Sequence, residues 1–154
     1  MKANLEFESL VATLPPLFAK LHNSKSFTKK GTTDQKGKKG VYAFYDGDSA
    51  LHVGRTRNLM RRLRGHTLKR HNTATFAFKL TRQILDRQAT YRPLGSRLNL
   101  MSDPDFKSEF ERQLERVKHM GVRFVEVEPP LQQYLLELYA HMEYGLGLDE
   151  FDTH

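Results

Sequence analysis

The chain has 154 residues, enough for one domain with a hydrophobic core, and it contains no cysteine, which excludes a disulfide framework and a thiolate metal site. Its 25 lysines and arginines outnumber 18 aspartates and glutamates, and a formal charge of +7 favours a polyanionic partner, nucleic acid ahead of an acidic membrane. Because no apolar run is long enough to span a membrane and no secretory signal is visible, we expect a cytoplasmic protein without a membrane partner.

Residues 4–21 show the helical spacing of apolar side chains, interrupted by Pro15 and Pro16. Proline lacks an N–H and disfavours a helical residue before it, so the pattern predicts two short helical pieces. The lysine-rich stretch 22–39 that follows is either a solvated linker, which its composition favours, or a flexible basic arm that contacts phosphates. We therefore expect an N-terminal helical extension and basic linker over residues 1–39, then a domain over residues 40–154, the whole forming one compact domain.

Two strands, a hairpin turn and a basic helix are predicted from residue 40 onward. Gly40–Tyr45 is rich in β-branched and aromatic residues, and Leu51–Gly54 reads as the return strand. Asp46-Gly47 between them is typical of a hairpin turn. Asn58 then opens a helix that is expected to run to about Leu68.

On this helix, at about 100° per residue, Arg62 and His66 fall on the same side as Leu59 and Leu63. The opposite side, which we expect to face solvent, carries the remaining arginines Arg57, Arg61 and Arg64. Two interpretations of the inward groups stay open. Each could be a satisfied structural residue, which is the simpler interpretation of His66, or Arg62 could point at an anionic partner.

The next segments predict further helices and a third strand. Thr73–Arg87 fits a helix with Asn72 as its cap, and residues 89–102 read as a loop. Asp103-Pro104 is a typical helix start, and the inner stripe of that helix continues to about Met120, with Gly121 as its end. Val122–Val127 alternates and is rich in β-formers, which predicts a strand.

The last predicted helix, Leu131–Tyr144, has an apolar face that we expect to pack on the core: Leu131, Leu135, Leu138 and Met142. Its polar flank carries Tyr134, Glu137 and His141. Glu137 and His141 are one turn apart and near enough to pair, although most helical glutamates are ordinary surface carboxylates. All elements together predict an α/β (α+β) fold, a small three-stranded, mainly antiparallel sheet flanked by helices, with an N-terminal helical extension and a helical insertion.

The tripeptides Gly40-Val41-Tyr42 and His52-Val53-Gly54, followed by Arg62 and His66, resemble the GIY-YIG nuclease family. The signature of that family is a GIY and a YIG tripeptide on adjacent strands, followed by a helix with an essential arginine. His52 departs from the family, which usually has tyrosine there. The resemblance covers residues 40–66 and extends weakly over residues 122–149, so that residues 71–121 read as an insertion of helices.

The resemblance implies a metal-dependent endonuclease that hydrolyses phosphodiester bonds, with DNA favoured over RNA. The family binds Mg²⁺ or Mn²⁺ through a glutamate on the helix after the third strand, and Glu137 matches that position, with Glu143 as the competitor. Asp149 stands where the family usually has asparagine. It would be either an additional metal carboxylate or, as we prefer, a structural or capping residue.

The implied catalytic set is Tyr42, His52, Arg62, His66 and Glu137. Arg62 would hold the phosphate in a forked contact and stabilise charge in the transition state. His52 would replace the family's tyrosine as the base, with the Tyr42 hydroxyl beside it, because an imidazole titrates near neutral pH. The residues expected to contact the nucleic-acid backbone are Gly54, Arg55, Arg61, Arg64 and Lys69.

Two other functions stay open. The same scaffold could be a nucleic-acid-binding module with nuclease activity weakened by His52 and Asp149, in which case binding persists without metal. A basic protein-interaction domain would instead bind nucleic acid weakly and without salt sensitivity, whereas true phosphate binding falls steeply with salt.

Overall fold

The computed structural model describes residues 3–28, 33–87 and 92–147. The chain divides into two compact units, one formed by Met1–Met60 with Met120–His154 and the other by Arg61–His119. We call them the sheet unit and the helical unit and describe each by itself. The division predicted from the sequence, an extension to residue 39 followed by a nuclease-like domain, stays a prediction.

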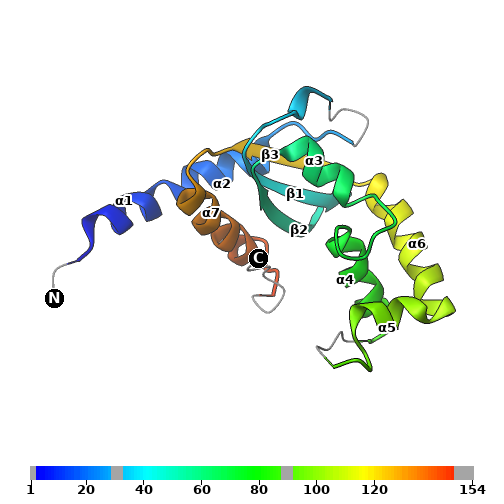
Figure 1. The fold of residues 1–154 in the computed structure, drawn as a ribbon. Helices are drawn as coiled ribbons and strands as arrows, with labels where there is room; N and C mark the ends of the chain where they lie inside the picture. The colour runs from blue at the N-terminus through cyan, green and yellow to red at the C-terminus, as the bar shows by residue number, and fades with distance from the viewer. Residues whose placement is uncertain (1–2, 29–32, 88–91, 148–154) are drawn as a thin grey trace. The chain divides into compact units, whose positions relative to one another are not determined.

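The sheet unit is built on three antiparallel strands, β1 (Gly40–Asp46), β2 (Ser49–Thr56) and β3 (Gly121–Glu126), in the order β2-β1-β3 (Figure 1). The predicted α+β fold with a three-stranded antiparallel sheet and helices packed on it is confirmed. The hairpin register pairs Tyr42 with Gly54 and Phe44 with His52, and it shifts at a bulge after Phe44. Strand β2 is longer than the predicted return strand, because pairing begins directly after the turn.

One face of the sheet packs against two helices, α2 (Leu14–Asn23) and α7 (Pro130–Glu143). Val41, Ala43 and Val53 point to this face, and they share a core with Leu14 and Leu21 of α2 and with Leu136 and Ala140 of α7. Because side chains alternate along a strand, Tyr42, Phe44, His52 and Gly54 point to the other face.

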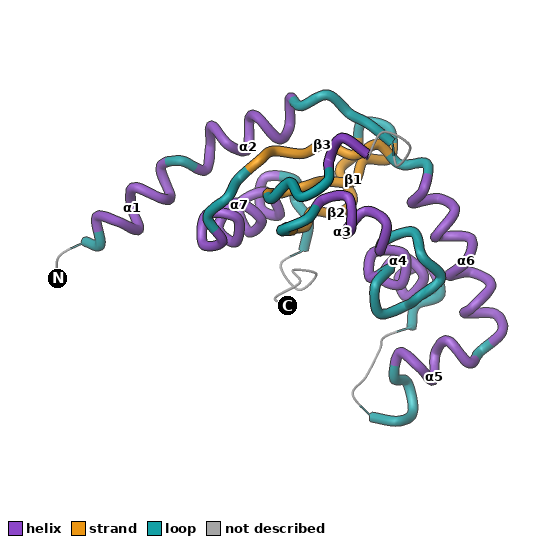
Figure 2. Tube along the Cα trace, turned by 45° about the horizontal axis from the view of Figure 1, so that its top comes forward, coloured by secondary structure: helices purple, strands orange, loops and turns teal. Residues whose placement is uncertain are grey.

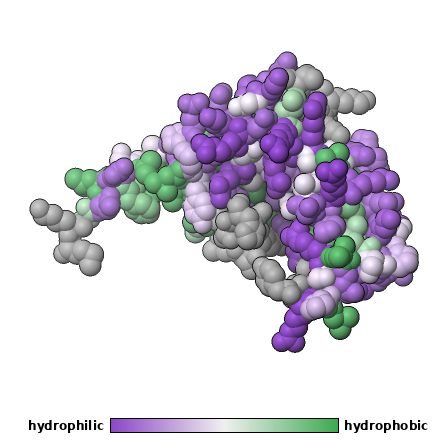
Figure 3. Space-filling model, in the orientation of Figure 1, coloured by the Kyte–Doolittle hydropathy of each residue, from purple (hydrophilic) through white to green (hydrophobic). Residues whose placement is uncertain are grey.

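The N-terminal segment forms two short helices, α1 (Leu5–Ala12) and α2, as predicted. Asn4 caps α1 by accepting the Phe7 N–H at 2.9 Å, and the two prolines lie in the first turn of α2, where a helix has no N–H bond to lose. No residue of α1 is buried, and Leu5 is 77% exposed, so that apolar surface of this helix is visible in Figure 3.

Within the linker, the described part includes a 3-10 turn, η2 (Thr33–Gln35), and a bridge between Phe27 and Val122. Phe27 donates to and accepts from the Val122 backbone at 3.0 and 2.7 Å. The segment before residue 28 therefore extends the β3 side of the sheet by one bridge.

The helical unit contains α4 (Thr75–Ile84), α5 (Arg97–Ser102) and α6 (Pro104–Lys118), as Figure 2 shows, and helix α3 (Leu59–Gly65) leads into it. Its core is aromatic, since Phe78 packs against Phe106 and Phe110 with ring centroids 5.3 and 6.4 Å apart.

Several predicted boundaries in this region were wrong. The N-cap of α4 is Ala74 rather than Asn72, and α3 ends at Gly65 because turns follow it. The predicted loop over residues 89–102 ends in helix α5, whose N-cap Ser96 accepts the Asn99 N–H. Gly121 begins β3, whereas α6 ends with His119 as its C-cap.

The predicted core face of α7 was only partly right, because Leu135 packs against the core but the ends of the stripe do not. Leu131 and Met142 are 58% and 63% exposed, and the buried residues of the helix are instead Gln133, Leu136, Glu137, Ala140 and His141. The small Ala140 permits close packing on the sheet, and the Gln133 amide donates to the Val127 carbonyl at 2.5 Å, so this polar group is satisfied inside. None of the described helices is both long and apolar enough to cross a membrane.

Candidate functional site

A buried ion pair joins α7 to the edge strand β2. Arg55 Nε lies 2.8 Å from Glu137 Oε2, and the side chains are 27% and 3% exposed. The Arg55 guanidinium also lies 5.0 Å from the centre of the Tyr134 ring. Glu137 is therefore a buried, charge-paired group, not the surface carboxylate that its position on the predicted polar flank indicated.

The two signature tripeptides meet at Gly54. A Cβ atom at this position would lie 2.4 Å from Tyr42 Oη and 2.5 Å from its Cζ, so the phenol ring occupies the space that a side chain would need. Tyr42 is fully buried, and its ring centroid is 6.1 Å from that of His52, which is also buried. The structure thus brings Tyr42, His52 and Gly54 together on one face of the hairpin.

Glu137 belongs to the opposite face. Arg55 alternates with Gly54 along β2 and points to the same side as Val41 and Val53, the side that α7 covers. The predicted site residues of the sheet unit therefore form two groups: Tyr42, His52 and Gly54 on one face, and Arg55 with Glu137 on the other.

Arg62 and His66 belong to the helical unit. Arg62 Nη2 donates to Thr75 Oγ1 at 3.2 Å, and Nη1 donates to the Thr73 carbonyl at 3.5 Å. His66 follows the end of α3 and is fully buried. Its backbone N–H donates to the Arg62 carbonyl at 3.1 Å. Burial, and next the positive charge of Arg62, hold the pKa of the His66 imidazole well below its usual range.

The predicted inward and outward sides of helix α3 are confirmed. Leu59 and Leu63 are buried, whereas Arg61 and Arg64 are exposed. Lys69 is exposed as well and lies 3.8 Å from a Glu111 carboxylate oxygen, a distance typical of a weak surface pair. Arg61, Arg64 and Lys69 are thus placed where a polyanion could reach them.

The chemistry of Glu137 fits a hard divalent cation, because such ions prefer carboxylate oxygen and Mg²⁺ is often held by one or two carboxylates together with water. Among the described residues, no group of three or more histidine, aspartate or glutamate side chains is placed to hold a metal ion. Glu143, the competing position, is exposed near the end of α7, and Asp149 lies outside the described residues.

Sequence reasoning assigned Arg55 to the nucleic-acid backbone and missed its pairing with Glu137. A signal was present, since the alternation of β2 places Arg55 beside Val41 and Val53 on the core side. A charged residue on a buried strand face requires a partner, and the only elements that can supply one are those packed on that face.

No family model matches the chain, and no curated protein or solved structure matches it either. The fold and the site define a class in structural terms: an α+β protein whose three-stranded antiparallel sheet carries a buried arginine–glutamate pair at one edge.

Proposed function

We propose that this protein is a divalent-metal-dependent nuclease of the GIY-YIG type that hydrolyses phosphodiester bonds, with DNA as its substrate. The observation that supports this best is Glu137, a carboxylate with 3% side-chain exposure on the helix that packs against the GVY and HVG hairpin. Burying a charge costs free energy, and groups retained at that cost are concentrated at functional sites. A nucleic-acid partner and a cytoplasmic location are part of the same proposal.

Glu137 is the residue that would hold Mg²⁺ or Mn²⁺. When bound, the ion would act as a Lewis acid on the phosphoryl oxygens and lower the pKa of a bound water. Arg55 Nε lies 2.8 Å from Glu137 Oε2, so the guanidinium would stand beside an ion held by this carboxylate. Arg55 would be the group beside the ion that contacts a phosphate, which a guanidinium matches by a forked contact.

The roles expected from the sequence, charge neutralisation for Arg62 and proton transfer for His52 with Tyr42, stay part of the proposal as separate candidates. Within the sheet unit, His52 and Tyr42 are buried on the face opposite Glu137, so they do not share a site with the proposed metal ligand. The rings of His52 and Tyr42 are neighbours on one face of the hairpin, with centroids 6.1 Å apart. His66 is fully buried, and its low pKa keeps the imidazole neutral, so it would support Arg62 rather than exchange protons with solvent.

The test is cleavage of labelled single-stranded, duplex and branched DNA with and without Mn²⁺ or Mg²⁺, using the wild type, Arg62→Ala, Glu137→Gln and Glu143→Gln. We expect metal-dependent cleavage in the wild type and its loss in Arg62→Ala and Glu137→Gln. Glu143→Gln is the matched control, since it removes an exposed carboxylate from the same helix. Loss only in Glu143→Gln would move the metal ligand there, and a wild type inert with both metals would overturn the proposal.

A nucleic-acid-binding module is the second candidate, and it is favoured by the ion pair itself. Arg55 already neutralises Glu137, so the pair needs no metal to be stable. In that case DNA binding is unchanged by removal of divalent cations, no substrate is cleaved, and Arg62→Ala weakens binding no more than the loss of a nearby phosphate contact does.

A further inference from the structure

The net positive charge of the chain belongs entirely to the helical unit. Arg61–His119 contains 14 lysines and arginines against six aspartates and glutamates, a formal charge of +8. The sheet unit contains 11 against 12, a formal charge of −1. An attraction for polyanions therefore comes from the unit that does not contain the proposed metal carboxylate.

Within the helical unit, basic groups gather around the buried ring of Phe78. The Arg97 guanidinium lies 4.9 Å from the centre of this ring and that of Arg82 lies 5.7 Å from it. The His71 ring is 6.0 Å away, and Arg97 Nη1 donates to the His71 carbonyl at 3.3 Å. We name His71, Arg82 and Arg97 the basic cluster.

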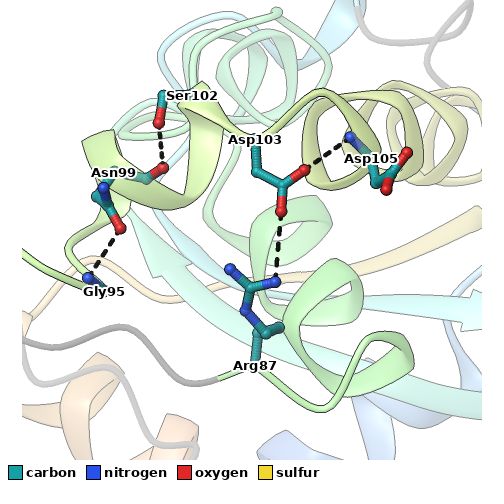
Figure 4. A network of polar contacts seen from close by, with 6 residues as sticks. All are labelled: Arg87, Gly95, Asn99, Ser102, Asp103 and Asp105. Atoms are coloured by element: carbon teal, nitrogen blue, oxygen red, sulfur yellow. Dashed lines mark hydrogen bonds and ion pairs between the residues drawn. The ribbon is translucent and has the colours of Figure 1, made fainter.

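The start of α5 holds Arg97 in place. Ser96 Oγ accepts the Asn99 N–H at 3.2 Å, and Asn99 Oδ1 accepts the Gly95 N–H at 2.9 Å. Figure 4 shows the Gly95–Asn99 bond and the Ser102 hydroxyl donating to the Asn99 carbonyl at 2.5 Å. A guanidinium fixed by a capped turn and a ring contact loses less conformational entropy when it binds an anion.

The cluster lacks an acidic counterpart at Arg97. Asp103 is used by Arg87, whose Nη1 lies 3.4 Å from Oδ2, and by the start of α6, where Oδ1 accepts the Asp105 N–H at 2.9 Å (Figure 4). Among the described residues, no carboxylate pairs with Arg97. Partial burial, and next the charge of Arg97, lower the pKa of His71, as expected where like charges face each other.

We propose that the basic cluster of the helical unit is a phosphate-binding site for nucleic acid. The inference rests on the proposed function in one respect, namely that the polyanion is the substrate. Arg97 supplies a guanidinium that lies over the Phe78 ring, is exposed at the surface and pairs with no carboxylate among the described residues, so it can bind phosphate oxygens.

The experiment is fluorescence anisotropy of the full chain with labelled single-stranded and duplex DNA in EDTA, over a series of salt concentrations. The variants are Arg97→Gln, Arg97→Lys and, as the matched control, Arg87→Gln, an arginine of the same unit whose charge Asp103 already neutralises. For Arg97→Gln we expect about tenfold weaker binding, because one charge-assisted hydrogen bond is lost. The plot of the logarithm of the binding constant against the logarithm of the salt concentration should become less steep, by about one phosphate contact.

Arg97→Lys keeps the charge but loses the bidentate geometry of the guanidinium, so the salt dependence of binding should be unchanged while part of the affinity is lost. Arg87→Gln binds as the wild type does. Equal effects of Arg97→Gln and Arg87→Gln overturn the site, and so does a wild type that fails to bind DNA at low salt. EDTA prevents metal-dependent cleavage, so the binding experiment and the cleavage experiment are independent. Equal binding of the Arg97 and Arg87 variants would overturn the phosphate site alone, and absence of cleavage would overturn the nuclease proposal alone.

Discussion

At the scale of single residues, the two glycines of the signature tripeptides have a steric explanation. A Cβ at Gly40 would lie 2.0 Å from the Val125 carbonyl oxygen, and one at Gly54 would meet the Tyr42 phenol. Both glycines are therefore needed for the sheet to form as it does. Their presence alone says nothing about catalysis.

Gly54→Ala should destabilise the protein by about 1–3 kcal/mol, because the buried Tyr42 ring must move. Gly65→Ala is the control, since a Cβ there would meet nothing closer than 3.7 Å and alanine favours the helix. Urea unfolding of both variants measures the difference. Equal stabilities would show that the ring has room to shift.

His66 should make stability depend on pH. Its pKa is lowered in the folded state by burial and by Arg62, so the unfolded chain binds more protons below its ordinary value of 6.5. The free energy of unfolding should stay level above pH 6.5 and decrease below it, by at most about 1.4 kcal/mol per pH unit from this group.

Urea unfolding between pH 5.5 and 7.5 measures this slope, and His66→Leu should flatten it whatever its effect on stability at pH 7.5. His71, whose pKa is also lowered, contributes in the same direction, and His71→Gln separates its part. A slope that persists in His66→Leu with His71→Gln would assign the pH dependence to other groups.

At the scale of elements, α7 shows how a helix can bury its polar side. The stripe Leu131, Leu135, Leu138 and Met142 has regular apolar spacing, yet the buried face contains Leu136, Ala140 and the charged Glu137. The Arg55 ion pair and the Gln133 hydrogen bond satisfy Glu137 and Gln133, so burial does not leave these two side chains unpaired.

Leu136→Ala should therefore cost about 2–5 kcal/mol, as for a fully buried leucine, and Leu131→Ala should change stability by no more than about 0.5 kcal/mol. Thermal or urea unfolding distinguishes the two. A larger loss of stability in Leu131→Ala than in Leu136→Ala would show that the apolar stripe predicted from the sequence is the buried face.

At the scale of the whole molecule, the sheet unit carries the proposed carboxylate site and the helical unit carries the excess positive charge. For the proposed nuclease, this division would separate two requirements, since a metal site needs carboxylates and a polyanion needs cations. The formal charge of +7 is thus not a uniform property of the surface.

Removal of divalent cations with EDTA should abolish cleavage and leave DNA binding in place, because the expected binding groups are cations of the protein. Binding should decrease steeply as salt is raised. Gel assays of cleavage and anisotropy of binding, made on one preparation, check both parts. Cleavage in EDTA would contradict the role of Glu137, and salt-insensitive binding would contradict the role of the basic groups.

Much of the fold could be predicted from local patterns. The strand β1, the two N-terminal helices and the cap of α6 follow from short-range signals, such as Asp46-Gly47 in the turn and Asp103 before Pro104. The inward side of α3 was also predicted, since Leu59 and Leu63 are spaced as in an amphipathic helix and both are buried. Asn72 was wrongly predicted as the cap of α4, which is Ala74, and Gly121 was wrongly predicted as the end of α6, although it begins β3.

The sequence by itself determined the class of fold and the hairpin with its two glycines, because turns, caps and alternation act over a few residues. The candidate groups Tyr42, His52 and Glu137 came from the resemblance to a nuclease family and stay predictions. Only the tertiary structure decided that Glu137 is buried against Arg55, that it lies on the opposite sheet face from Tyr42, and that Arg97 stacks on Phe78. Such outcomes depend on which faces pack together. A polar side chain can be buried wherever a partner distant in the sequence satisfies it, and local periodicity contains no information about that partner.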